Sequence, residues 1–96
     1  MRGIRWSRPA LFDYSHIIDR IREANPRAAA RIRQLVKDRL ALLASHPRMG
    51  RVGRIAGTRE LVLSRTPYIV VYELHASDDQ IYILRVLHGA QRWPPR

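Results

Sequence analysis

Residues 57–89 contain three largely apolar stretches, GTRELVL (57–63), PYIVVY (67–72) and ILRVLHG (83–89). They are rich in β-branched and aromatic residues, which predicts three consecutive β-strands. The segment Tyr68–Tyr72 is apolar throughout, as expected of a central strand that is covered on both faces. Ser77-Asp78-Asp79 then supplies turn residues before Ile81–His88, so we expect the last two strands to form an antiparallel hairpin.

A short strand is predicted at Ile4–Trp6, and a helix follows it. Ser7 is an N-cap candidate and Pro9 stands where helix starts favour proline, so we expect the helix to begin near Pro9. Apolar residues then recur at steps of three and four, so they should share one face of the helix. This face consists of Leu11, Tyr14, Ile17, Ile18, Ile21 and Ala24. Polar residues of this helix, Asp13 among them, are expected to point away from that face.

A second helix is predicted directly after the first. Asn25 offers a cap and Pro26 a first-turn proline, so the two helices should form a hairpin. The apolar face of the second helix consists of Ala29, Ile32, Leu35, Val36, Leu40 and Leu43. Ser45-His46-Pro47 should end it, because a residue before proline is pushed out of the helical region. Residues 48–57, with Arg51 and Arg54, are predicted to be a mobile arginine-rich loop that either follows a phosphate backbone or keeps the protein soluble.

The composition indicates a binding partner that carries negative charge. The 96 residues include 18 Lys+Arg and 8 Asp+Glu, a formal net charge of +10, and Lys37 is the only lysine. Arginine suits bidentate contacts to phosphate and carboxylate, so we expect nucleic acid, a nucleic-acid machine or an acidic protein as partner. The length predicts one domain over residues 1–96.

The same composition argues against cofactor chemistry and a membrane location. There is no cysteine, and the four histidines lack metal-ligand spacing, so neither a metal nor another cofactor is expected. No apolar run approaches the ~18 residues that span a bilayer, and no signal-peptide core follows the basic N-terminus. The predicted compartment is the cytoplasm, with no membrane partner.

Two residues of the last strand are candidates for chemistry. Period two places Arg85 on the face of Ile81, Ile83 and Leu87, where an unpaired arginine is costly to bury. We expect it to pair with a carboxylate such as Glu60 or Glu73, or else to act in catalysis. His88 ends the strand as either a general acid–base candidate or a capping residue. In the tail, Arg92 and Trp93 are candidates for an interface anchor, unless Trp93 packs back on the domain.

Nearly the whole chain resembles the RelE/ParE family of bacterial toxins. The resemblance rests on Trp6, the Asn25-Pro26 break, Pro47, the strand 57–62, Pro67-Tyr68 and the stretch 85–89. It implies an α+β fold, in which an N-terminal strand and a two-helix hairpin pack on a mostly antiparallel four-stranded sheet in the order β-α-α-β-β-β. It also implies a cognate acidic antitoxin. Only through this antitoxin would the toxin be brought to operator DNA.

The family contains two activities, and the residues favour one of them. RelE-like members cut mRNA on the ribosome with several basic residues, one of which directly follows the third-strand tyrosine. Here Ile69 follows Tyr68, and isoleucine cannot stabilise a phosphorane. The resemblance therefore implies a ParE-like poison of DNA gyrase, a function that need not be enzymatic. The alternative is a metal-independent ribonuclease with Arg59, Arg85 and His88 as its incomplete catalytic set.

Target or partner binding is assigned to the basic loop, the last strand and the tail, as candidates Arg51, Arg54, Arg85, His88, Arg92 and Trp93. A third hypothesis is a catalytically inert nucleic-acid-binding module that uses the basic helix and loop. The sequence lacks the RNP, KH and zinc signatures of such modules.

Overall fold

The computed structural model describes residues 2–95, so Met1 and Arg96, the ends of the predicted domain, lie outside the described residues. The elements follow in the order β1 (Gly3–Trp6), α1 (Arg8–Ala24), α2 (Pro26–Ser45), β2 (Arg51–Val52), β3 (Thr58–Val62), β4 (Tyr68–His75) and β5 (Gln80–His88). The α+β prediction is confirmed, but the described residues form five strands where four were expected. The additional strand is β2, which lies inside the stretch that was predicted to be a loop.

Local capping explains where the two helices begin and end. The Ser7 side chain accepts a hydrogen bond from the backbone N of Ala10 at 3.2 Å, and Asn25 accepts one from Ala28 N at 3.1 Å. Pro26 occupies the first turn of α2, where its missing N–H leaves no helical bond unmade. Both helix starts, the break at Asn25 and the end of α2 at Ser45 are therefore confirmed.

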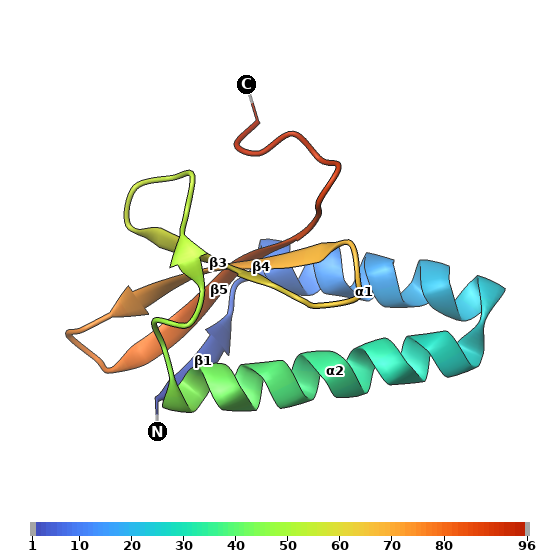
Figure 1. Cartoon of the computed structure of the whole chain (residues 1–96), viewed down its shortest axis with the longest axis horizontal. Coiled ribbons are helices and arrows are strands. Elements are labelled where there is room, and N and C mark those ends of the chain that lie inside the picture. The colour runs from blue at the N-terminus through green and yellow to red at the C-terminus, as the bar shows by residue number, and fades with distance from the viewer. Residues whose placement is uncertain (1, 96) are drawn as a thin grey trace.

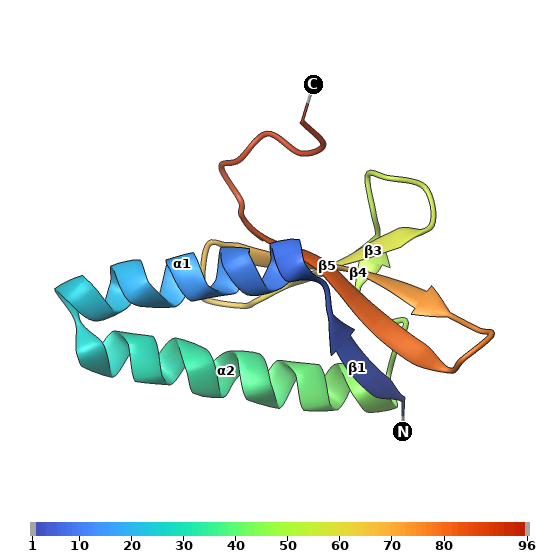
Figure 2. The same cartoon turned by 180° about the vertical axis from the view of Figure 1, so that it is seen from behind.

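The sheet has the strand order β1-β5-β4-β3-β2. β1 runs parallel to β5, and the other neighbours are antiparallel. The helical hairpin covers one face, while the C-terminal segment and the β2–β3 loop lie on the side away from α2 (Figures 1 and 2). Buried side chains of both helices meet the sheet in one cluster, which includes Ala10, Val36, Leu40, Leu43, Leu61, Val70, Tyr72, Ile81, Ile83 and Val86.

A β-bulge in β5 changes which residues face the helices. Val71 pairs with Arg85 but Tyr72 pairs with Ile83, so Leu84 is an extra residue between two pairs. Val86 consequently joins Ile83 on the helix side, and Arg85 lies on the opposite side. The predicted alternation was wrong here, because a strict period of two holds only without an inserted residue.

β4 is covered on both faces, as its apolar run predicted. Ile69, Val70, Val71 and Tyr72 are all buried. The face turned away from the helices, which we call the outer face, carries Glu60, Ile69, Val71, Arg85 and Leu87. Val71 is 0% and Leu87 2% exposed, so the segments that lie over the outer face exclude water from its centre.

Candidate functional site

The C-terminal segment closes over the outer face through Trp93. The Arg85 guanidinium carbon lies 5.6 Å from the centroid of the Trp93 ring, which places the cation over the aromatic face. Arg54 Nη1 donates to the backbone oxygen of Trp93 at 3.4 Å. Trp93 is half-buried and its Nε1 is shielded from water. This tryptophan therefore packs back on the protein, which was one of the two expectations for it.

Arg51 of β2 and Arg54 of the following loop converge on one buried carboxylate beneath this segment. Glu60 is 1% exposed, and its Oε1 lies 3.0 Å from Arg51 Nη2 and 2.9 Å from Arg54 Nη2. Its Oε2 accepts from Arg54 Nε at 3.1 Å and from Arg54 N at 3.0 Å. Hydrogen bonds from Arg54 outweigh burial and lower the pKa of Glu60 to about 2. Arg51 and Arg54 thus hold the β2–β3 loop to the sheet and still expose part of each side chain.

Arg85 pairs with Asp13 of α1 instead of Glu60 or Glu73. Asp13 Oδ2 lies 2.7 Å from Arg85 Nε, and Oδ1 lies 2.9 Å from Arg85 Nη2. The expectation of an internal salt bridge is confirmed, while the expected partners and the outward direction of Asp13 were wrong. These hydrogen bonds raise the pKa of Arg85, so its charge is held by the fold.

Asp13 also completes the edge of the sheet. β1 pairs with β5 only as far as Ile83, so the next backbone groups of β5 lack a strand partner on that side. Ser7 Oγ donates to Leu84 O at 3.0 Å, and Val86 N donates to Asp13 Oδ2 at 3.0 Å. The side chains of Ser7, the N-cap of α1, and of Asp13 within α1 thereby continue the hydrogen bonding that β1 begins.

The remaining candidates occupy separate places. Arg59 Nη1 donates to the backbone oxygens of Gly50 at 2.8 Å and Arg48 at 3.3 Å, which ties it to the start of the β2 segment. His88 is exposed, and its Nδ1 accepts from Ala90 N at 3.0 Å. Arg92 is exposed in the tail. Arg85 pairs with Val71 on the outer face, whereas Arg59 and His88 lie on the other face of the sheet, on β3 and β5, which β4 separates. The fold therefore does not gather these three side chains around one point.

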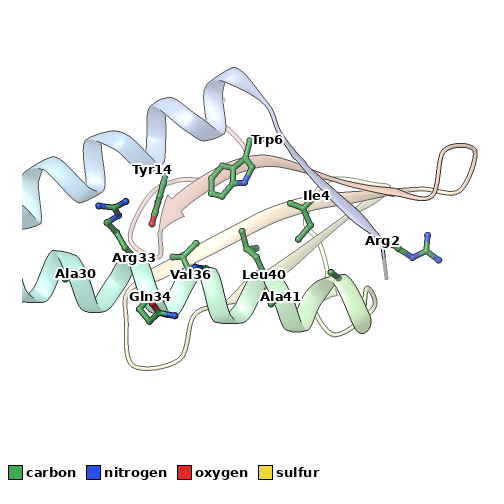
Figure 3. A pocket seen from close by; sticks show the side chains of 12 residues that line it. Arg2, Ile4, Trp6, Tyr14, Ala30, Arg33, Gln34, Val36, Leu40 and Ala41 are labelled. Atoms are coloured by element: carbon green, nitrogen blue, oxygen red, sulfur yellow. The ribbon is translucent and has the colours of Figure 1, made fainter.

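A separate groove opens beside the helical hairpin, between β1, α1 and α2 (Figure 3). Its volume is about 720 Å³. Ile4, Trp6 and Leu40 project into it, with Arg2 at one end and Arg33 near Tyr14 at the other (Figure 3). Burial raises the pKa of the Tyr14 hydroxyl, an effect that Arg33 opposes. A groove beside the helical hairpin was expected from the sequence, but Tyr14 and Leu40 were assigned to the core and not to its lining.

Within residues 2–95 the structure groups no three His, Cys, Asp or Glu side chains in a way that suits a metal ion. Neither described helix has the length and apolar character needed to cross a bilayer.

Comparison with known proteins places this architecture in a family. Residues 4–93 match the family described as "ParE toxin of type II toxin-antitoxin system, parDE". The chain is 41% identical to Y4kP, a candidate toxin of Sinorhizobium fredii, over 97% of this chain and 94% of that protein. It is 34% identical to toxin RelE2 of Caulobacter vibrioides, over 95% of this chain and 99% of that protein.

Solved structures show the same fold. The chain matches the chromosomal ParDE toxin–antitoxin system from P. aeruginosa with a TM-score of 0.78 and 25% identity, over 92% of this chain and 96% of that chain. A match to the intact E. coli RelBE toxin–antitoxin complex has a TM-score of 0.67 and 16% identity, over 96% of this chain and 100% of the other.

Proposed function

This chain belongs to the ParE toxin family of type II toxin–antitoxin systems, and we propose that it poisons DNA gyrase until a cognate antitoxin neutralises it. The observation that carries the choice of target is the chemistry of the outer face. Ile69 stands where the RelE-like pattern has a basic residue, and it is only 8% exposed. An apolar side chain at that position offers no hydrogen bond to a reacting phosphate.

The state of the candidate catalytic residues supports the same proposal. Arg85 is held by Asp13, and Arg59 donates to backbone oxygens. A nuclease that stabilises a pentavalent phosphorane needs donors aimed at one point in space. Here Arg85 and Arg59 already donate hydrogen bonds to groups of the protein itself. His88 contacts neither of them. Binding to a large protein target requires no such convergence.

Ribosome-dependent mRNA cleavage is the second candidate function. The 34% identity to toxin RelE2 favours it, because that protein carries the name of the nuclease branch. His88 is exposed at the end of β5 and would be the acid–base residue under this alternative.

We place the antitoxin in the groove between β1 and the helical hairpin. Its apolar lining, with Ile4, Trp6 and Leu40, suits hydrophobic anchors, and Arg2, Arg33 and Lys37 supply positive charge for an acidic segment. Association should therefore slow as salt is raised. Stopped-flow measurement of antitoxin binding at 50 and 500 mM salt tests this. An on-rate that is independent of salt contradicts the charge argument.

Parallel cleavage assays distinguish the two targets. Wild type, His88→Ala and Trp93→Ala are compared for gyrase-mediated DNA cleavage and for ribosomal mRNA cleavage, with exposed Arg27→Ala as the control. We expect the wild type to cause gyrase-mediated DNA cleavage and Trp93→Ala to cause less of it, because the outer face loses its aromatic cover. The mRNA should stay intact with every variant. Ribosome-dependent mRNA cleavage that falls about 100-fold in folded His88→Ala, without any effect on gyrase, would establish the alternative instead.

A further inference from the structure

A second cleft, of about 350 Å³, lies between α1 and the end of β5. Its lining includes Phe12, His16 and Arg20, which stand four residues apart and form a stripe along α1. Tyr68 and His88 contribute from the strands and Gln91 from the tail. The cleft shares no lining residue with the groove assigned to the antitoxin. It thus requires its own explanation.

Aromatic surface is concentrated at this cleft. Phe12 is 65% exposed, although exposed phenylalanine is unfavourable in water, and its ring lies 4.2 Å from that of His16 between centroids. The Tyr68 and His88 rings meet edge to face at 5.8 Å. Flat rings that are open to solvent are the surfaces on which nucleic-acid bases stack.

The two imidazoles present opposite hydrogen-bonding atoms. His88 Nδ1 accepts from Ala90 N at 3.0 Å, so in the neutral ring the proton resides on Nε2, which is a donor. His16 Nδ1 lies 3.3 Å from the Phe12 carbonyl oxygen, which only accepts, so the tautomer that forms this hydrogen bond carries its proton on Nδ1 and leaves Nε2 as an acceptor. In these tautomers the two rings offer one donor and one acceptor, the combination that the edge of a nucleobase also carries.

Positive charge completes the cleft. Asp13 also lines it, but that carboxylate is already neutralised by Arg85 at 2.7 Å. Arg20 is exposed, and among the described residues no carboxylate pairs with it. Its guanidinium is therefore free to take a phosphate in a bidentate contact.

We propose that this cleft binds one nucleoside monophosphate unit, with the base against Phe12 and the phosphate on Arg20. The unit is either a free nucleotide or one residue of a single-stranded nucleic acid. The volume lies at the lower end of the ~300–1,000 Å³ range of ligand pockets, which suits a ligand of this size. This site shares no lining residue with the antitoxin groove, and its binding test does not depend on the proposed gyrase target.

Binding of 5′-AMP and of a fluorescent ten-residue oligoadenylate to the full chain tests the proposal. Phe12→Ala and Arg20→Ala should each weaken binding at least ~10-fold, because stacking and phosphate contacts are lost separately. Leu42→Ala removes an exposed apolar side chain and Arg27→Ala an exposed cation, both on α2, and these controls should change affinity less than ~2-fold. All four positions are exposed, and circular dichroism verifies that each variant is folded.

The two ligands separate the sources of the nucleotide. A free-nucleotide site is identified if 5′-AMP binds saturably and its affinity falls in Phe12→Ala and Arg20→Ala. A site for single-stranded nucleic acid is identified if only the oligonucleotide binds with these losses. The proposal is overturned if neither ligand binds. It is equally overturned if Arg27→Ala weakens oligonucleotide binding as much as Arg20→Ala, since binding would then reflect diffuse charge.

Discussion

Replacement of Asp13 by alanine should destabilise the protein strongly, because this one carboxylate joins α1 to β5. Asp13 is 13% exposed and accepts hydrogen bonds from Arg85 Nε, Arg85 Nη2 and Val86 N. The stranded Val86 N–H costs about 1–3 kcal/mol, since Val86 is buried. The unpaired Arg85 adds about 1–2 kcal/mol, which is less than a fully buried charge would cost because its side chain is 31% exposed.

The expected loss is therefore about 2–5 kcal/mol out of a total stability of ~5–14 kcal/mol for a domain of this length. It should lower the melting temperature by at least ~10 °C. Thermal and urea unfolding of the purified chain measure both quantities. Asp13→Asn should lose less, because the amide oxygen still accepts from Val86 N.

A matched control lies on the same helix. Asp19 forms only an exposed pair with Arg22, at 3.1 Å, so Asp19→Ala should change stability by less than ~0.5 kcal/mol. The double variant Asp13→Ala/Arg85→Ala should be more stable than the sum of the single losses predicts, because the stranded cation is then absent. If Asp13→Ala and Asp19→Ala unfold at the same urea concentration, the proposed connection between α1 and β5 carries no stability and the reasoning is refuted.

Two other buried groups give distinct expectations. The folded pKa of Glu60 is about 2 against an ordinary 4.5, so its stabilisation is present above pH 4.5 and disappears as pH falls through 2. This stabilisation amounts to on the order of 3 kcal/mol. In urea titrations between pH 7 and 2, the free energy of unfolding should therefore fall less steeply with pH in Glu60→Gln than in the wild type. Equal pH dependence of the two proteins would contradict this prediction. Tyr72→Phe should cost about 1–3 kcal/mol, because the hydroxyl donates to Pro47 O at 2.7 Å and accepts from Gly50 N at 3.0 Å. Urea unfolding checks this, and an unchanged midpoint would show that water replaces the hydroxyl.

Local signals in the sequence predicted most of the fold. The Ser7 and Asn25 caps act within three residues, so helix starts follow from the sequence without knowledge of the partners. The burial of β4 on both faces was also predictable from the sequence, because a strand that is apolar throughout and rich in β-branched residues is typical of a position covered on both faces. The resemblance to the RelE/ParE family, read from the chain itself, agrees with the family match over residues 4–93.

Features that depend on how the strands pair could not be predicted from the sequence. β2 consists of Arg51 and Val52 alone and exists because β3 supplies its hydrogen bonds. The bulge at Leu84 is a difference in register between two strands, so no periodicity within β5 predicts it. The face on which Arg85 lies follows from this bulge.

The sequence by itself determined the charge of +10, the two capped helices, the apolar strands and the family. Tertiary structure alone decided which charges are available to a partner. Asp13 pairs with Arg85 across 72 positions of the chain, and Glu60 pairs with both Arg51 and Arg54. Arg20, by contrast, stays exposed in the cleft that Phe12 also lines. The physical reason is that an ion pair forms within about 4 Å in space, a distance that spacing along the chain does not encode.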